Sequence, residues 1–221
     1  MNQIPVFSVF RSKVPEKLTL LSALLSWFPT VIIVAAVSSL IWIGLRPSFL
    51  SCFSLIFVVY GFPVLAYRLH QRFYPVKEGI SYLLGKEYSP WWGSHQFQVI
   101  YIAFPFLESL LRLIPGVFSA WLRLWGAKIG QNIYWTPKLE IADRGLIEIG
   151  DRVVFGYGVE LYSHVIKPKN ENLTLYVKPI KIGDNVFLGA GSRLGPGVKV
   201  KDKSYLPITT DLSVNQKAGL Q

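Results

Sequence analysis

Histidine supplies the clearest candidate chemistry in this chain. The 221 residues contain three histidines, His70, His95 and His164, and one cysteine, Cys52. An imidazole can take up and release a proton near neutral pH, so each histidine is a candidate general base. Cys52 lies in a long uncharged stretch, and no serine or cysteine stands in a nucleophile-elbow motif. Proton transfer by a histidine, without a covalent enzyme intermediate, is therefore the chemistry that the residues favour.

Two of the three histidines have a simpler explanation. His70 follows an uncharged apolar run, where it is most simply a polar residue at a membrane interface. His95 lies in a tryptophan-rich segment and is more simply structural. His164 stands apart because it falls in a regular repeat, and that repeat predicts where its side chain points.

The repeat occupies the C-terminal part of the chain. A large apolar residue, here called the anchor, recurs every six positions, with a slip of two after Ile141 and an insertion after Leu161. A smaller residue usually follows four positions later, and glycine often follows directly, as in Ile149-Gly150. The anchors are Ile129, Trp135, Ile141, Ile149, Phe155, Leu161, Ile182, Leu188, Leu194, Val200 and Leu206.

A six-residue period is typical of a solenoid in which each unit is one short strand and one corner. Three units close a triangular coil, whereas ordinary antiparallel strands would show period 2 and hairpin turns. We therefore expect a prism over residues 129–206. In this register His164 occupies a corner, one residue before the inward-facing Val165, so its side chain points outward. An exposed surface histidine is the alternative interpretation.

The pattern resembles the hexapeptide-repeat acyltransferases, whose fold is a left-handed parallel β-helix. The most similar stretches are residues 161–164 and, after the inserted loop, residues 178–191, which begin KPIKIGDNVFLG. They are similar to the branch of maltose, galactoside and colanic-acid O-acetyltransferases, in which a histidine precedes the loop. Residues 91–130 also resemble, more weakly, the membrane-anchored terminal part of some non-ribosomal peptide synthetase-like proteins.

The resemblance implies direct transfer of an acyl group, most simply from acetyl-CoA, to a hydroxyl, with His164 as the catalytic base and no metal. A backbone N–H would hold the oxyanion. It also implies a homotrimer with active sites between subunits. Phe187 and Tyr162 are assigned to substrate binding, because Phe187 stands where relatives often carry a tryptophan near the acceptor. The residues assigned to the coenzyme are Gly189, Ala190, Gly191, Lys199 and Lys201. The glycines could equally well serve only to form a corner of the coil, and the lysines could equally well be a solvated basic face.

Two features depart from the family pattern. The repeat fades after Leu206, so residues 207–221 are expected to be a tail, and the slip at 141–149 shortens the regular prism. The insertion 166–181 is expected to fold over the site and to shape acceptor choice. A non-catalytic trimeric scaffold on the membrane is therefore the alternative function. A zinc-dependent carbonic anhydrase on the same prism would need three histidine ligands, and the repeat holds only His164.

Two uncharged stretches precede the repeat, residues 18–45 and 48–69, with only Arg68 charged in the second. A helix needs about 20 apolar residues to cross a bilayer. They predict a transmembrane hairpin within an N-terminal segment, residues 1–75. Two buried core helices are the alternative, which the lack of a polar face on either stretch disfavours.

Lysine and arginine predict the orientation of the hairpin. Basic residues flank it on both sides, while its short connection carries Arg46 alone; the flanking residues are Arg11, Lys13, Lys17, Arg68, Arg72 and Lys77. The positive-inside rule then places both termini and the repeat domain in the cytoplasm. We expect an integral membrane protein, in the inner membrane of a bacterium.

The middle segment, residues 76–128, is apolar and aromatic but interrupted by prolines. Its main apolar run, 97–114, carries Glu108 and Arg112. We expect amphipathic helices in the membrane interface, with arginines near lipid phosphates. A helical subdomain packed on the repeat domain is the alternative.

The formal net charge of +10 points to an acidic partner. Residues 1–128 hold 11 of the basic and 4 of the acidic residues, so most of the excess lies in the membrane-associated part. The chain has no nucleic-acid motif. The expected partners are therefore the lipid bilayer and a carbohydrate acceptor: a lipid-linked sugar, a glycolipid or a polysaccharide precursor.

Overall fold

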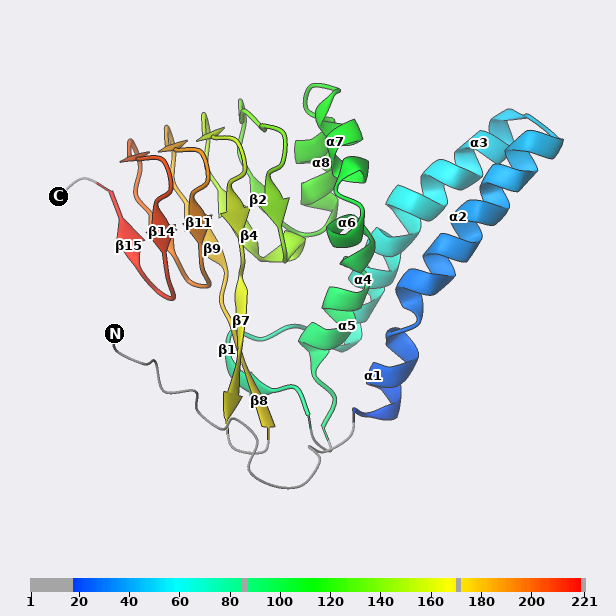
Figure 1. Cartoon of the computed structure of the whole chain (residues 1–221), viewed down its shortest axis with the longest axis horizontal. Helices are drawn as coiled ribbons and strands as arrows, with labels where there is room; N and C mark the ends of the chain where they lie inside the picture. Colours follow the sequence, from blue (N-terminus) through cyan, green and yellow to red (C-terminus); the bar gives the residue numbers. More distant parts are fainter. Residues whose placement is uncertain (1–17, 85–86, 170–171, 220–221) are drawn as a thin grey trace, which may run out of the picture.

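The computed structural model describes residues 18–84, 87–169 and 172–219. Figure 1 shows a coil of short strands at one end, short helices in the middle and a long helical hairpin at the other end. Part of the orientation prediction and part of the predicted insertion lie outside the described residues: Arg11, Lys13, Lys17 and residues 170–171.

The N-terminal helices form the long hairpin. Its arms consist of α1 (Leu20–Leu25) and α2 (Phe28–Leu45), then α3 (Phe49–Ile56), the π-helix η1 (Phe57–Gly61) and α4 (Phe62–Phe73). Pro29 and Pro63 stand in the first turns of α2 and α4, where the helical geometry changes, because proline has no N–H to continue the ladder. Despite these breaks, each arm is long and apolar enough to cross a membrane. Only 11% of the apolar stretch in the first arm and 22% of that in the second are buried inside the protein. The two apolar helices predicted from the sequence are present.

The repeat forms a parallel β-helix with three faces, and consecutive strands belong to different faces. Face I contains β2 (Lys128–Ile129), β4 (Ile147–Ile149), β9 (Ile180–Ile182), β12 (Lys199–Val200) and β15 (Lys217–Ala218). Face II contains β5 (Val154–Phe155), β10 (Phe187–Leu188) and β13 (Tyr205–Leu206). Face III contains β3 (Glu140–Ile141), β6 (Glu160–Leu161), β11 (Arg193–Leu194) and β14 (Asp211–Leu212). Anchors such as Phe155, Leu188 and Leu194 are fully buried, which confirms the predicted coil and its register.

The I–II edge, between faces I and II, explains the recurring glycine and aspartate. The carboxylates of Asp151, Asp184 and Asp202 accept hydrogen bonds from the backbone N–H one coil back, at 2.7, 2.8 and 2.9 Å. A Cβ at Gly150 would lie 2.2 Å from Asp184, so glycine makes room for each carboxylate. The next residue takes a left-handed φ of 55–56° in every coil, at Asn132, Arg152, Asn185 and Lys203.

The prism is longer than predicted. The expectation of a tail over 207–221 was wrong, because β14 and β15 pair in parallel with β11 and β12 and add to the coil. Leu212 and Ala218 keep the six-residue spacing from Leu206. The stretch that seemed to break the repeat, 207–210, is a corner in which Thr209 has a φ of 55°.

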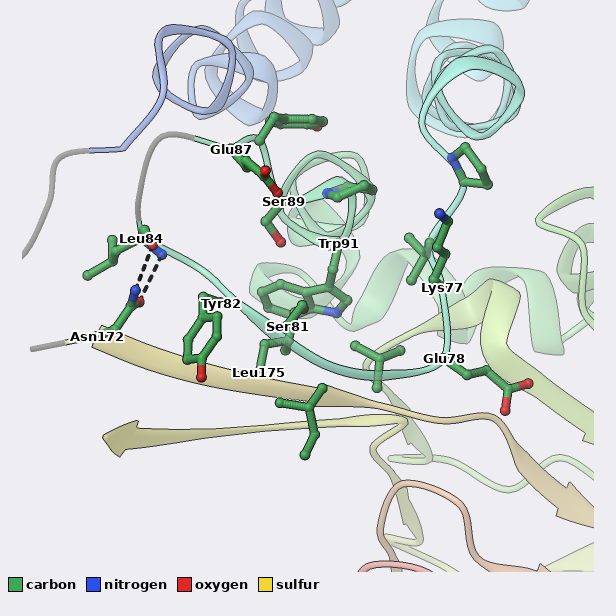
Figure 2. Close-up of a pocket in the computed structure, with 16 residues that line it drawn as sticks. Lys77, Glu78, Ser81, Tyr82, Leu84, Glu87, Ser89, Trp91, Asn172 and Leu175 are labelled. Carbon is green, nitrogen blue, oxygen red and sulfur yellow. Dashed lines mark hydrogen bonds between the residues drawn. The ribbon is translucent and has the colours of Figure 1, made fainter. Parts of the chain in front are cut away.

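The insertion forms a small sheet at the III–I edge. There β7 (His164–Lys169) and β8 (Asn172–Val177) form an antiparallel hairpin, and β1 (Gly79–Tyr82) pairs with β8. Figure 2 shows the Asn172 side chain hydrogen-bonded to the backbone of Leu84, which fastens the segment after β1 to the β7–β8 hairpin. The prediction that Val165 faces the prism interior was wrong. Ser163 is the last inward residue, with no exposure, and the chain leaves the coil at His164.

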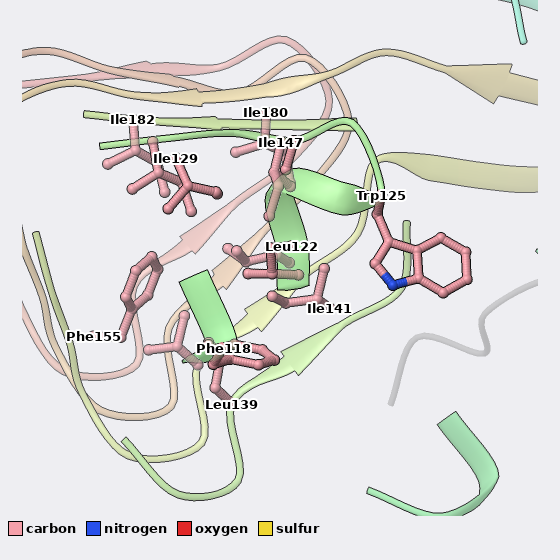
Figure 3. Close-up of a cluster of buried hydrophobic side chains, with 14 of the residues drawn as sticks. Phe118, Leu122, Trp125, Ile129, Leu139, Ile141, Ile147, Phe155, Ile180 and Ile182 are labelled. Carbon is pink, nitrogen blue, oxygen red and sulfur yellow. The ribbon is translucent and has the colours of Figure 1, made fainter. Parts of the chain in front are cut away.

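Four short helices lie between the hairpin and the prism: α5 (Pro90–Gln96), α6 (Val99–Ala103), α7 (Phe106–Arg112) and α8 (Val117–Leu124). Phe118 and Leu122 of α8, with Trp125, pack on Ile129 and Ile141 and close the open end of the coil (Figure 3). Burying each such side chain contributes about 1.5–3 kcal/mol. The helical group is therefore the cap of the prism, as the alternative interpretation of 76–128 describes.

Charges in the cap point inward. Glu108 is 2% exposed and pairs with Arg144 of the prism at 2.6 Å and with Arg112 at 3.1 Å. The expectation that Arg112 lies near lipid phosphates was therefore wrong, because the polar side of α7, with Glu108 and Arg112, faces the end of the prism. The outer side of the cap exposes apolar residues, among them Phe106, Leu110 and Leu113.

Candidate functional site

His164 is held at the edge where the coil ends and the inserted hairpin begins. Ser163, directly before it, faces the interior and donates its hydroxyl to the carbonyl of Leu146. On the other side, β7 pairs His164 with Val177. These contacts fix the backbone, and the imidazole keeps 17% of its surface exposed. The outward placement predicted for His164 is therefore close to what the structure has, although it begins a strand.

Asp143 is the direct partner of His164. Its Oδ2 lies 2.6 Å from His164 Nδ1 and also accepts the backbone N–H of Ser163 at 3.2 Å. The residue is 2% exposed. Burial by itself raises the pKa of the Asp143 carboxyl. The hydrogen bond from His164, the positive charge of its imidazolium form and the hydrogen bond from Trp91 outweigh burial, so the pKa of Asp143 lies below its ordinary value. An ionised Asp143 accepts the Nδ1 proton of His164, which leaves Nε2 with a free lone pair.

Helix α5 of the cap supplies the rest of the surroundings. Trp91 donates its indole N–H to Asp143 Oδ1 at 2.9 Å, and its ring centroid lies 4.4 Å from that of His164. His95 stacks on Trp91, and its ring centroid lies 5.9 Å from that of His164. Burial lowers the pKa of His95 to about 4, so this second imidazole is neutral at physiological pH. His70 lies elsewhere, buried, with Nε2 at 2.6 Å from the Tyr88 hydroxyl, rather than free at an interface.

The other predicted site residues are not gathered around His164 within one chain. Tyr162, near His164 in the chain, donates its hydroxyl to Glu160 at 2.9 Å. Phe187 lies on face II and stacks on Tyr205. The stretch 189–191 forms a II–III corner, where a Cβ at Gly189 would meet the next coil at 2.4 Å. Lys199 lies on face I, and Lys201 begins the following I–II corner.

Sequence reasoning missed Asp143 and Trp91. Asp143 lies in the slip after Ile141, which the six-residue pattern treats as an interruption. Only the structure, through the pairing of β3 with β6, puts Asp143 one coil before Ser163. Trp91 had no signal, because only the folded cap brings it to the prism. Among residues 18–84, 87–169 and 172–219, no group of three histidine, cysteine, aspartate or glutamate side chains could hold a metal ion.

Comparisons with known proteins bear on the repeat. No family model matches the chain. The galactoside O-acetyltransferase of Escherichia coli is 33% identical over 98 residues, 41% of this chain and 48% of that protein. The putative colanic acid biosynthesis acetyltransferase WcaF of the same species is 30% identical over 112 residues, 40% of this chain and 62% of that protein. This chain spans about half the length of the curated relatives it matches.

Solved structures give a weaker likeness. A hexapeptide-repeat acetyltransferase of Vibrio cholerae, solved with acetyl coenzyme A, is 17% identical, with a TM-score of 0.38 over 60% of this chain and 87% of that one. Both Escherichia coli relatives are acetyltransferases by name, and their similarity covers part of this chain.

Proposed function

We propose that the protein is a membrane-anchored O-acetyltransferase that transfers the acetyl group of acetyl-CoA to a hydroxyl of a lipid-linked sugar, a glycolipid or a polysaccharide precursor. The observation that carries this proposal is the hydrogen bond between the buried Asp143 carboxylate and His164 Nδ1. It orients the imidazole and leaves Nε2 as a base. The partial similarity to named acetyltransferases supports the same chemistry.

The reaction follows from this geometry. Nε2 of His164 removes the proton of the acceptor hydroxyl as that oxygen attacks the thioester carbonyl. The tetrahedral intermediate collapses with cleavage of the carbon–sulfur bond, and the imidazolium returns its proton to the leaving thiolate. Asp143 balances the positive charge that His164 carries between these two steps. The products are an acetyl ester and coenzyme A.

The coenzyme would bind along the prism. A shallow cavity of about 430 Å³ on face I is lined by Lys128, Lys181 and Lys199, with Glu148 between them. Three ammonium groups against one carboxylate suit an anion such as the phosphates of coenzyme A. Because the proposed coenzyme residues lie on several edges, we include a homotrimer in the proposal, in which one protomer's face would meet the next protomer's His164.

The hairpin would attach the protein to a bilayer. Tyr101 and Trp121 of the cap donate hydrogen bonds to the carbonyls of Val59 and Tyr60, halfway along the second arm. The arm from Phe49 to Val59 extends beyond the cap by roughly 15 Å at 1.5 Å per residue. That is about half of a hydrocarbon core of about 30 Å. We therefore propose that the cap, with its apolar outer side, lies in the interface while the tip enters the membrane, both termini facing the cytoplasm.

The activity is tested by coenzyme A release from the full chain in lipid nanodiscs, with acetyl-CoA and glycolipid acceptors. His164→Ala should lower the rate about 1,000-fold, because it removes the base. The variant also removes one donor to the buried Asp143, so its unfolding temperature should fall, and the rates are compared at a temperature where both proteins are folded. An unchanged rate of acceptor-dependent release would exclude His164 as the base.

The lone Cys52 reports on the anchor. It lies near the tip of the hairpin and is exposed on the protein surface. In native membranes a water-soluble maleimide should leave Cys52 unlabelled, and detergent should make it react. Equal labelling before and after detergent would show that the tip lies in water.

A further inference from the structure

A cavity of about 640 Å³ lies between the cap and the inserted sheet. Figure 2 shows segment 75–84 crossing over β8, with Ser89 and Trp91 at the start of α5 on the opposite side. The walls come from residues 75–84 and 87–91 and from the distant strand β8, which meets them only in the folded protein. It is separate from the basic cavity on face I.

This cavity borders the proposed catalytic pair. Trp91 lines it and donates its indole N–H to Asp143. Val177 also lines it and is the strand partner of His164. A molecule held in the cavity therefore lies against Trp91 and Val177, which are direct neighbours of Asp143 and His164.

The lining points to an uncharged, hydroxyl-rich ligand. The Ser89 hydroxyl, in a residue 5% exposed, has no hydrogen-bond partner among the described residues. Tyr82 and Trp91 supply aromatic surface, which suits the C–H faces of a sugar ring, and polar groups placed around such surface fix its orientation.

Charge separates this cavity from the coenzyme. Lys77 is the basic residue of the lining and is opposed by Glu78 and Glu87, so the cavity disfavours phosphates. The cavity begins at Pro75, two residues after the end of α4 at Phe73.

We propose that this cavity binds the sugar headgroup of the acceptor. The proposal rests on the acetyltransferase function proposed above and identifies where its acceptor is recognised. The recognised chemistry is the sugar ring, whether it is lipid-linked or free in solution.

Native mass spectrometry of the full chain in phosphatidylglycerol nanodiscs tests the proposal. The probe is glucosyl-diacylglycerol, with diacylglycerol as the sugar-free lipid and methyl β-D-glucopyranoside as the soluble sugar. Ser89→Ala removes the unpartnered hydroxyl, and Ser81→Leu fills the cavity from an exposed position on β1, which folding should tolerate. Each should lower retained glycolipid about threefold to tenfold, the effect of one or two lost contacts. Ser213→Leu, an exposed serine of the last coil, is the matched control and should change nothing.

The outcomes separate the two proposals. Selective retention of the glycolipid supports a lipid-linked source, and binding of the methyl glucoside alone supports a soluble one. Equal retention by the wild type and both cavity variants, or equal retention of diacylglycerol, would overturn the cavity proposal. His164→Ala should retain the glycolipid like the wild type. Binding without any acetyl transfer in the wild type would reject the proposed function and leave the cavity assignment standing.

Discussion

Two edges of the same prism use aspartate in opposite ways. At the I–II edge, Asp151, Asp184 and Asp202 repeat coil after coil, and each accepts a backbone N–H of the preceding coil. At the III–I edge, Asp143 is buried and binds His164 and Trp91 as well as a backbone N–H. The first arrangement stacks coils, and the second holds an imidazole.

The difference lies in what offsets burial. A buried carboxylate without partners is strongly disfavoured, so Asp143 needs several donors to remain ionised. The prism supplies two of them, from Ser163 and His164, and the cap supplies the third, from Trp91. The site is therefore shared between the prism and the cap, whereas the I–II edge belongs to the prism alone. This comparison predicts that isosteric changes at the two edges have unequal effects.

Asp143→Asn should cause the largest loss in this comparison. Each carboxylate oxygen accepts at least one N–H, so the amide NH₂ of an asparagine meets a donor at either position. If the amide nitrogen replaces Oδ2, His164 Nδ1 must accept, and Nε2 then carries the proton and cannot act as a base. We expect kcat to fall about 100-fold or more, measured by coenzyme A release.

Asp184→Asn is the matched control at the other edge. Asp184 Oδ1 accepts the Asp151 N–H, and an asparagine oxygen can do the same. The rate should stay within about twofold of the wild type, with a change in unfolding free energy of about 0.5 kcal/mol or less. Similar rate losses in Asp143→Asn and Asp184→Asn would contradict the distinction between the edges.

Trp91→Phe should have a smaller effect that isolates the contribution of the cap. The change keeps an aromatic ring beside His164 and removes the donor to Asp143 Oδ1. A lost hydrogen bond to a charged acceptor predicts about a tenfold lower kcat. The acidic limb of the kcat/KM profile should move to higher pH, because a carboxylate with one donor fewer holds the imidazolium more strongly.

Trp92→Phe provides the comparison for that experiment. Trp92 is the neighbouring tryptophan, and its indole N–H binds the Ser22 carbonyl and the Ser26 hydroxyl of the hairpin. Its loss should leave both kcat and the pH profile unchanged. If both tryptophan variants shift the profile equally, the effect comes from loosening the cap and not from Asp143.

The two edges also differ in how far the sequence predicts them. At the I–II edge, apolar period, glycine and turn residues recur together, so the coil and its register follow from the pattern. The end of the prism was missed because small or polar residues surround the last anchors, Leu212 and Ala218. His164 was proposed from the sequence because it precedes an insertion in a motif that resembles a known family.

The remaining site residues could not be predicted from the pattern. Asp143 lies where the period slips, and a single slip carries no information about which residue faces which. Trp91 reaches Asp143 across 52 positions of chain through packing of the cap. The charges Glu108 and Arg112 suggested a helix in the membrane interface with its arginine near lipid phosphates, and only the structure shows that Arg144 completes a buried network with them.

His95, which stacks on Trp91 beside the III–I edge, predicts the smallest effect: a change in how the unfolding free energy depends on pH. Burial lowers its pKa to about 4 in the folded protein, against about 6.5 in an unfolded chain. Between these values the unfolded chain binds a proton that the folded chain does not, so folding free energy is lost as pH falls below about 6.5. His95→Phe keeps a ring stacked on Trp91 without this proton. Its unfolding free energy should therefore decline less steeply with acid than that of the wild type, by about 1 kcal/mol per pH unit between pH 6 and 5. Urea unfolding of both proteins over this range measures the difference, and parallel curves would mean that His95 is protonated in the folded state as readily as in water.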